Sequence, residues 1–254
     1  MIRRLRRAFA LAIALAISLL RYGAERLNGS MTMEKRALWL QEASKRVLAS
    51  LNLSYVAHGE PPVRGLVVSN HLSYLDIAIL SAVMPCFFIA KLEVGRWPVF
   101  GTAARAGGTI FLNRKSMASA NEAARMIAAR LALTIPVVLF PEATSSDGTQ
   151  VQRFHSRLIH PATAAGSPVT SVALRYFAGR GVQSAMAERD LCWYGDATFL
   201  RHLWNVLGTD RLSATLQFGE SRIYPDGRTA AQQTHDEISA MRNSKQPTAI
   251  DAVR

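Results

Sequence analysis

Cysteine is scarce in this chain, and several common catalytic motifs are missing. Cys86 and Cys192 are the two cysteines among 254 residues, which excludes a fold built on disulfides and favours buried thiols in a reducing compartment. The chain has no G-x-S-x-G turn, Walker A loop, G-x-G-x-x-G or H-E-x-x-H motif, which argues against the commonest serine hydrolases, nucleotide-binding folds and zinc peptidases. His155 and His160 are five residues apart and would point to different helix faces, so we expect no metal site there.

Acidic residues are also few, and the imbalance points to anionic partners. Lysine and arginine number 30 against 18 acidic residues, a formal net charge of +12. Such a charge favours nucleic acid, anionic lipid headgroups or acidic carrier proteins. Because the chain lacks zinc-finger spacing and an RNA-binding aromatic pattern, we expect a membrane surface or a carrier protein and no nucleic acid. The length suits one α/β domain with a membrane-facing appendage.

A basic cluster followed by an apolar run forms the first segment. Ala8 to Leu20 would make a helix of only ~20 Å, against a bilayer hydrocarbon core of ~30 Å. A cleaved signal peptide and an ordinary core helix are the alternatives, but no A-x-A cleavage site follows the run. We predict a retained membrane-associated helix on the cytoplasmic face of the inner membrane, with its arginines toward anionic lipid. These arginines are Arg3, Arg4, Arg6, Arg7 and Arg21.

A second helix is expected after the break at Asn28-Gly29-Ser30. Between Met33 and Leu51 the apolar residues fall near one face and most charged residues on the other. The pattern fits a basic amphipathic helix lying on a bilayer equally well as an ordinary helix packed on the core. Together with the first helix it makes a two-helix membrane-associated segment over residues 1–54.

Short apolar runs alternate with helical patterns through the rest of the chain, which predicts an α/β fold: a central, largely parallel sheet flanked by helices. A catalytic domain is expected over residues 55–227. A short helix and a disordered polar tail are expected over residues 228–254. Expected strands are Leu66 to Ser69, Cys86 to Ala90, Thr109 to Leu112, Pro136 to Phe140, Val169 to Arg175 and Ala214 to Phe218. Expected helices are Leu75 to Val83, Ser116 to Leu131, His155 to Ala164 and Phe199 to Leu207.

His71 and Asp76 are the leading catalytic candidates. They follow a predicted strand and lie five positions apart, as a base and its orienting carboxylate would. The structural alternative is a helix-capping box, Ser73-x-x-Asp76. Arg114 and Glu142 also come just after predicted strands, and the carboxyl ends of parallel strands are where ligands usually bind.

Four ordered blocks give this candidate site a context. Together they resemble the glycerolipid and lysophospholipid acyltransferase family, whose best-known members are 1-acylglycerol-3-phosphate acyltransferases. The resemblance covers roughly residues 33–218, and the first and third blocks are specific in combination. The blocks are Asn70-His-Leu-Ser-Tyr-Leu-Asp76, Gly108-Thr-Ile-Phe-Leu-Asn-Arg114, Phe140-Pro-Glu-Ala-Thr-Ser-Ser-Asp-Gly148 and Val169-Thr-Ser-Val-Ala-Leu174.

The resemblance implies transfer of a fatty acyl group from a thioester to the free hydroxyl of a lysolipid. His71 would act as general base with Asp76 orienting it, and backbone N–H groups after Phe140 would stabilise the oxyanion. Substrate binding is implied for Arg114, Glu142, Thr144 and Lys91. The donor would be acyl-CoA or acyl carrier protein, with no further cofactor and no metal. The leading acceptor is 1-acylglycerol-3-phosphate, giving phosphatidic acid.

Two departures from the family pattern leave the acceptor open. The third block usually reads Phe-Pro-Glu-Gly-Thr-Arg, but Ala143 replaces the glycine and Ser145 the arginine. Losing the arginine removes a bidentate phosphate donor, which Arg153 or Arg157 would have to replace. Lyso-ornithine lipid or another lysolipid is therefore the alternative acceptor. Outside this reaction, a non-catalytic lipid-binding protein and a thioester hydrolase are the alternatives.

Overall fold

A single twisted sheet forms the centre of the molecule. The computed structural model describes residues 1–97, 100–112, 117–178 and 185–244, and within them seven strands follow the order β1-β7-β6-β2-β5-β3-β4. The β6–β7 pair is antiparallel and the other pairs are parallel, which confirms the predicted, largely parallel α/β sheet. The strands are β1 (Leu53–His58), β2 (Leu66–Ser69), β3 (Phe87–Lys91), β4 (Ile110–Leu112), β5 (Val137–Leu139), β6 (Val169–Ala178) and β7 (Leu212–Phe218).

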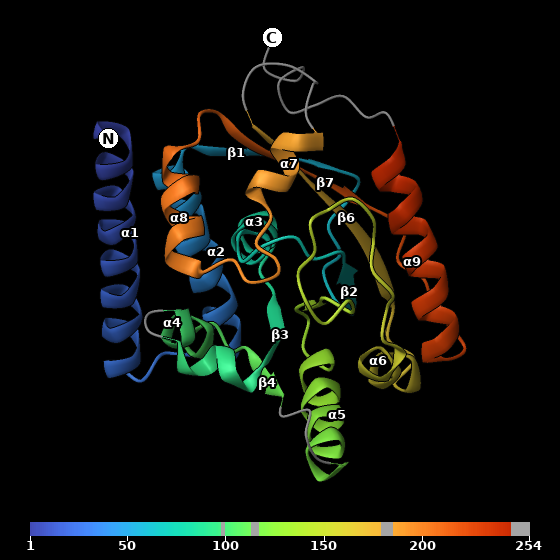
Figure 1. The fold of residues 1–254 in the computed structure, drawn as a ribbon. Helices are drawn as coiled ribbons and strands as arrows, with labels where there is room; N and C mark the ends of the chain where they lie inside the picture. Colours follow the sequence, from blue (N-terminus) through green and yellow to red (C-terminus); the bar gives the residue numbers. More distant parts are fainter. Residues whose placement is uncertain (98–99, 113–116, 179–184, 245–254) are drawn as a thin grey trace.

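Helices cover both faces of this sheet, which is why its central strands β2 and β5 are buried along their whole length (Figure 1). Side chains alternate between two cores: Val67 and Val138 face one, whereas Leu66 and Val137 face the other. The first core is closed by α2 (Met33–Leu51), α3 (Leu75–Val83) and α8 (Phe199–Gly208). The second is closed by α5 (Met117–Leu131), α6 (His160–Ala164) and α9 (Gly227–Asn243).

The six predicted strands are all present, and the structure adds β1 and two short helices that the sequence did not predict, α4 (Phe100–Ala106) and α7 (Ala185–Leu191). Strand β1 lies at the sheet edge and is mostly half-buried, so it lacks the continuous apolar run that marks the central strands. The helix expected from His155 to Ala164 is wrong in part. It consists of a 3₁₀ turn, Ser156–Leu158, followed by α6, which has Pro161 in its first turn.

The expectation of a short helix and polar tail from residue 228 is also wrong for most of that segment. Helix α9 runs from Gly227 to Asn243 and begins with Asp226, whose side chain accepts from the backbone N–H groups of Arg228 and Thr229. Its Ala230 and Ile238 are fully buried against the sheet. The outward face of α9 is polar, which is why the composition alone resembles a tail.

Helix α1 (Ile2–Leu27) is longer than the predicted apolar run and lies beside α2 and α8 (Figure 1). By length and apolar composition it is able to cross a membrane. The indole N–H of Trp39 on α2 donates to the Ser18 carbonyl of α1 (2.7 Å) and fixes the two helices together. The apolar face of α2 is buried in the first core, so the structure favours the packed-helix alternative for α2.

Two of the N-terminal arginines face the protein, contrary to the expectation that all would face lipid. Arg7 is buried and donates to the backbone carbonyls of Leu207 (3.3 Å) and Thr209 (2.6 Å), and Arg3 donates to the carbonyl of Gly208. These are the free carbonyls at the C-terminal end of α8, where cations are favoured. The two arginines therefore attach α1 to α8.

Candidate active site

The candidate residues meet at the carboxyl ends of three neighbouring strands. His71 follows β2, Glu142 follows β5, and Lys91 is the last residue of β3. Strand β5 pairs with both β2 and β3, so the loops that carry these residues share one edge of the sheet. His71 and Glu142 were both expected just after predicted strands, and the structure places both at this edge. Arg114, the fourth residue of this kind, lies outside the described residues.

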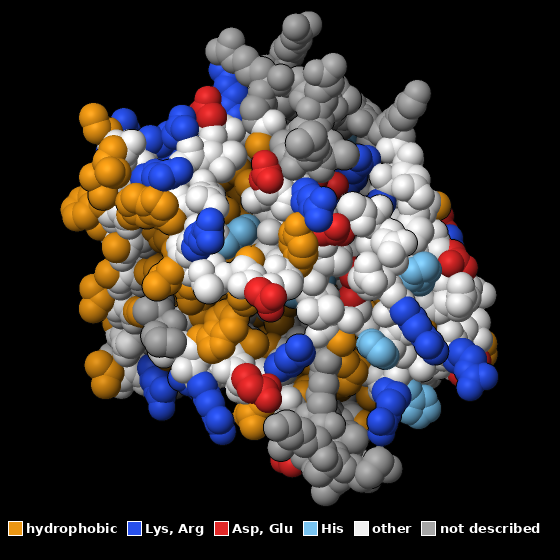
Figure 2. Space-filling view, in the orientation of Figure 1, with side chains coloured by type: hydrophobic (Ala, Val, Ile, Leu, Met, Phe, Trp, Pro, Cys, Tyr) orange, Lys and Arg blue, Asp and Glu red, His pale blue; other side chains and the backbone are white. Residues whose placement is uncertain are grey.

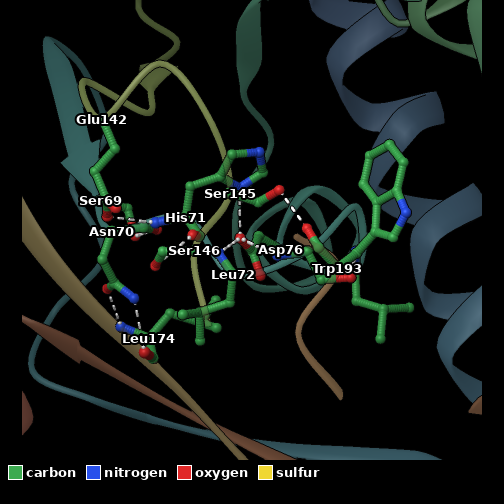
Figure 3. A network of polar contacts seen from close by, with 12 residues as sticks. Ser69, Asn70, His71, Leu72, Asp76, Glu142, Ser145, Ser146, Leu174 and Trp193 are labelled. Atoms are coloured by element: carbon green, nitrogen blue, oxygen red, sulfur yellow. Dashed lines mark hydrogen bonds and ion pairs between the residues drawn. The ribbon is translucent and has the colours of Figure 1, made fainter. Parts of the chain in front are cut away.

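His71 and Asp76 are hydrogen-bonded to each other (Figure 3). The Nδ1 atom of His71 is 2.7 Å from Oδ2 of Asp76, and the carboxylate is completely buried whereas 20% of the His71 side chain is exposed. The imidazole ring stacks on Phe140 at a centroid distance of 4.1 Å, which fixes the ring plane. A buried carboxylate accepting from Nδ1–H leaves the Nε2 lone pair free to accept a proton.

The Asp76 carboxylate also forms part of the helix cap that was the structural alternative to catalysis. Its Oδ2 also accepts from the backbone N–H groups of Leu72 (2.7 Å) and Ser73 (3.1 Å), just before α3 begins. The other half of a capping box is not formed among the described residues, because the Asp76 N–H donates to the Ser73 carbonyl and not to its hydroxyl. Asp76 therefore both orders the turn and orients His71.

Glu142 is hydrogen-bonded to the backbone of the histidine loop. Its Oε1 accepts from the backbone N–H of His71 (2.9 Å) and its Oε2 from that of Gln152 (3.3 Å). The side chain is buried, and burial raises the pKa of Glu142 to about 7, against the lowering effect of the two backbone N–H donors. Glu142 is not among the described residues that line the cavity; its contacts support a role in ordering the histidine loop, and the substrate contact that the resemblance implies stays a prediction.

The third-block loop adopts the backbone shape expected of a glycine. Ala143 has φ +66°, which costs an alanine more than a glycine. Farther along, the Ser146 N–H donates to the His71 carbonyl (2.9 Å), and the Ser145 hydroxyl donates to the Trp193 carbonyl. Ser145, which stands where the family has arginine, thus ties this loop to the segment before α8 (Figure 3).

Asn70, the residue before the histidine, joins the first block to the fourth. Its side-chain amide donates to the Leu174 carbonyl (3.0 Å) and its side-chain oxygen accepts from the Leu174 N–H (2.8 Å). Both groups belong to β6, the strand that pairs with β2 on the side away from β5. The asparagine therefore holds the histidine loop in register with the sheet.

A largely apolar cavity of about 390 Å³ opens at His71. Lys91 and Thr144, both expected to bind substrate, lie on its wall and are exposed. The cavity reaches from His71 to residues of α1 and α2. Its lining includes Leu15, Ser18 and Leu19 of α1, Trp39, Ala43 and Val47 of α2, Tyr74, Ile77 and Ala78 around α3, and Trp97, Phe100 and Trp193.

Three contributors to this site were not predicted from the sequence. The inner face of α1 lines the cavity although it was expected to serve the membrane alone. The other two are Trp193, which lines the cavity, and Tyr176, whose hydroxyl donates to Oδ1 of Asp76. Their roles depend on contacts across the sheet, which the sequence does not show. For Tyr176, its position two residues after the fourth block was a signal in the sequence that could have pointed to the site. Among the described residues, no three His, Cys, Asp or Glu side chains gather as a metal site would require.

Comparison with known proteins gives consistent matches. Residues 54–175 match the family described as Acyltransferase. The chain is 34% identical to a 1-acyl-sn-glycerol-3-phosphate acyltransferase of Neisseria meningitidis over 189 residues, covering 73% of this chain and 72% of the relative. It is also 34% identical to a lyso-ornithine lipid O-acyltransferase of Pseudomonas aeruginosa over 218 residues, covering 84% and 79%. The crystal structure of the 1-acyl-sn-glycerophosphate acyltransferase PlsC from Thermotoga maritima has the same fold, with a TM-score of 0.66, 18% identity and 97% of each chain covered.

Proposed function

The chain belongs to the glycerolipid and lysophospholipid acyltransferase family, and from this we propose that His71 catalyses transfer of a thioester-bound fatty acyl group to a lysolipid hydroxyl. That the chain is an O-acyltransferase follows from its relatives. The observation that carries the assignment to His71 is the 2.7 Å contact between its Nδ1 and the buried carboxylate of Asp76, beside an apolar cavity.

His71 supplies the base that a lipid hydroxyl needs. Its Nε2 takes the hydroxyl proton as the hydroxyl oxygen bonds to the thioester carbonyl carbon. When the C–S bond breaks, the imidazolium returns this proton to the departing thiolate. Asp76 accepts the hydrogen bond from Nδ1–H throughout and stabilises the imidazolium. Because the lipid hydroxyl is itself the nucleophile, no protein nucleophile is required.

The loop after Phe140 is suited to stabilise the oxyanion that forms on the thioester carbonyl. Thr144 and Ser145 lie on the cavity wall, and in the described part of the chain their backbone N–H groups donate to no protein acceptor. The positive φ of Ala143 sets the direction of the loop just before these groups. Backbone donors held in advance at such a place stabilise a developing negative charge without reorganising.

The cavity accommodates the fatty acyl chain. Its lining is largely aromatic and aliphatic, and it extends from His71 to the inner faces of α1 and α2. Acyl groups gain about 0.8 kcal/mol for each buried CH₂, so an apolar cavity of this kind retains a long chain. Lys91, exposed on the cavity wall, is placed to attract the anionic carrier of the donor, whether acyl-CoA or acyl carrier protein.

We propose 1-acylglycerol-3-phosphate as the acceptor, with lyso-ornithine lipid as the second candidate. The second candidate is favoured by one observation: Ser145 stands where the family has a phosphate-binding arginine, and its hydroxyl is engaged by the Trp193 carbonyl. Relatives of both named activities are about equally similar to the chain. The exposed Arg153 is the candidate for the missing positive charge.

Reaction at a membrane surface is the setting we propose, with α1 lying in the cytoplasmic interface. The outer side of α1 exposes Ile2, Leu5, Phe9 and Leu20 by 55–76%, and this apolar face is visible along one edge of the molecule (Figure 2). Because the folded domain lies beside α1 along the helix, a spanning orientation would carry polar surface into the hydrocarbon. A helix with one apolar face lies in the interface plane instead.

An acceptor panel tests this function. Purified protein receives radiolabelled acyl-CoA or acyl carrier protein together with 1-acylglycerol-3-phosphate, lyso-ornithine lipid or no acceptor. We expect labelled phosphatidic acid from the wild type, none from His71→Ala, and wild-type product from the matched control His155→Ala, which changes an exposed histidine. Label in ornithine lipid alone would support the second acceptor. Free fatty acid without acceptor would indicate a hydrolase, and transfer by folded His71→Ala at the wild-type rate would remove His71 from the mechanism.

A further inference from the structure

Asp76 has a second side-chain partner, on strand β6, which contributes no residue to the described cavity lining. Its Oδ2 holds His71, and its other oxygen, Oδ1, accepts a hydrogen bond from the hydroxyl of Tyr176 on β6. Asp76 is fully buried and Tyr176 is 1% exposed. The carboxylate is therefore held at both oxygens, with the histidine on one side and the phenol on the other.

The direction of this hydrogen bond is determined by chemistry. Burial raises the pKa of Tyr176 well above its ordinary value, and the nearby charge of Asp76 raises this pKa further. The phenol therefore keeps its proton at any pH at which the protein works. An ionised carboxylate is able only to accept, so Tyr176 is the donor.

We propose that Tyr176 is a positioning residue for acyl transfer, acting on His71 through Asp76. Its hydroxyl prevents the carboxylate from rotating away from His71 and draws part of the negative charge toward Oδ1. Both effects require the hydroxyl group and not merely an aromatic ring. This inference rests on the proposed role of His71 as the base.

The surrounding structure holds Tyr176 rigidly enough for such a role. Its backbone N–H donates to Oε1 of Glu188 on α7 (3.0 Å). Glu188 is paired with Arg242 of α9 through two contacts of 3.1 and 3.2 Å, and Arg242 also donates to the Leu174 carbonyl. Strand β6 is thus attached at residues 174–176 to both α7 and α9, while Asn70 attaches the same stretch to the histidine loop.

Few other ionisable groups face this chain of contacts. Besides Asp76, the titratable groups that the described elements place around His71 and Tyr176 are Glu142, Lys91, Glu188, Cys192, Tyr74 and Arg242. Tyr176→Phe removes one hydroxyl group and leaves each of these ionisable side chains in the protein. A change in the pH profile of such a variant therefore reports on the Tyr176–Asp76 contact.

Tyr176→Phe tests the proposal. We expect kcat/KM to fall about tenfold, because a buried carboxylate oxygen loses its donor. The acidic limb of the kcat/KM profile should move to higher pH by about half a unit, because Asp76 then holds the proton on His71 more strongly. Tyr224→Phe is the matched control, since Tyr224 is a buried tyrosine in the core on the opposite face of the sheet. An unshifted profile in folded Tyr176→Phe would overturn the proposal, whatever its rate.

Two further variants keep the test decisive if the phenylalanine variant is poorly folded. Site-specific 3-fluorotyrosine at position 176 preserves the side chain and makes its hydroxyl a stronger donor, so the acidic limb should move to lower pH. In the Asp76→Asn background, Tyr176→Phe should have little additional effect, because the two residues act through one contact. Full additivity in this cycle contradicts the inference. Retained activity of His71→Ala would instead refute the proposed function itself.

Discussion

The first and last helices of the described chain are built in opposite ways. Helix α9 turns its apolar residues inward, where Ala230 and Ile238 are fully buried, and exposes polar side chains. Helix α1 exposes large apolar residues along its outer side, among them Phe9 at 70% and Leu20 at 73%. The protein interior is therefore a sufficient partner for α9 but not for α1.

Among the charged residues, Arg242 of α9 and Arg4 of α1 show the same contrast, although Arg7 of α1 is buried as well. On α9, Arg242 is buried and its guanidinium is used entirely inside the protein, with Glu188 and the carbonyls of Leu174 and Gly148. On α1, Arg4 lies over the exposed ring of Trp204 at 5.5 Å, beside the apolar face. We infer from the difference that α9 stabilises the catalytic loops, whereas α1 combines a wall of the cavity with a surface for lipid.

The largest effect that would test this contrast is on stability. Arg242→Met leaves Glu188 buried without its cation, and we expect the free energy of unfolding to fall by about 3–5 kcal/mol. Arg222→Met is the control, because Arg222 pairs with Glu220 and Glu237 at the surface, where a loss of about 1 kcal/mol or less is expected. Urea unfolding measures both. Equal losses in the two variants would show that the buried Arg242–Glu188 pair contributes no more to stability than the surface pairs of Arg222.

The next effect concerns the outer face of α1. Leu5→Asp combined with Phe9→Asp should weaken binding to anionic vesicles about 100-fold, because two exposed apolar side chains no longer enter the interface. The free energy of unfolding should change by less than about 1 kcal/mol. Gln233→Asp combined with Ala240→Asp adds the same charge to exposed positions of α9 and should leave most of the binding intact. Sedimentation with vesicles decides, and equal losses in both pairs would contradict a role for the α1 face.

The third effect is a pH dependence of the free energy of unfolding, which we expect from Glu142 behind the His71 loop. The pKa of Glu142 is raised from 4.5 to about 7 in the fold, so the unfolded chain loses this proton at lower pH than the folded one. Between pH 5 and pH 8 the wild type should therefore lose about 2–3 kcal/mol of stability relative to Glu142→Gln. Urea unfolding of both proteins across this range measures the difference, in which groups common to both cancel. A constant difference would show that Glu142 is ionised throughout, and vesicle binding should not follow this titration.

The smallest effect is expected where α8 borders the α1 face. Trp204→Ala should weaken vesicle binding about fivefold, since a partly exposed indole suited to a membrane interface is lost. Ile223→Ala, a more exposed apolar residue that follows β7 and lies outside the α1 and α8 segments, is the control and should have no effect. If Ile223→Ala weakens binding as much as Trp204→Ala, the lipid-facing surface extends well beyond α1 and α8.

The loops that carry the candidate catalytic residues were predictable from local sequence to an unusual degree. His71 and Asp76 lie within one turn, and the strand before them is a continuous apolar run, so their contact requires little beyond the order of residues. Glu142 was predicted near the site because it follows another such strand. Its actual contacts, with the backbone N–H groups of His71 and Gln152, depend on how two loops meet and are not visible in the sequence.

The sequence by itself determined the parallel α/β sheet, the edge at which the candidate residues gather and the acyltransferase family. These follow from apolar runs and motif spacing, which act over a few residues. Only the tertiary structure decided that α1 lines the cavity, that α9 is part of the fold, and that Tyr176 reaches Asp76 across 100 residues of chain. The physical reason is that burial and side-chain contacts across the sheet depend on which elements become neighbours, and composition alone does not encode that choice.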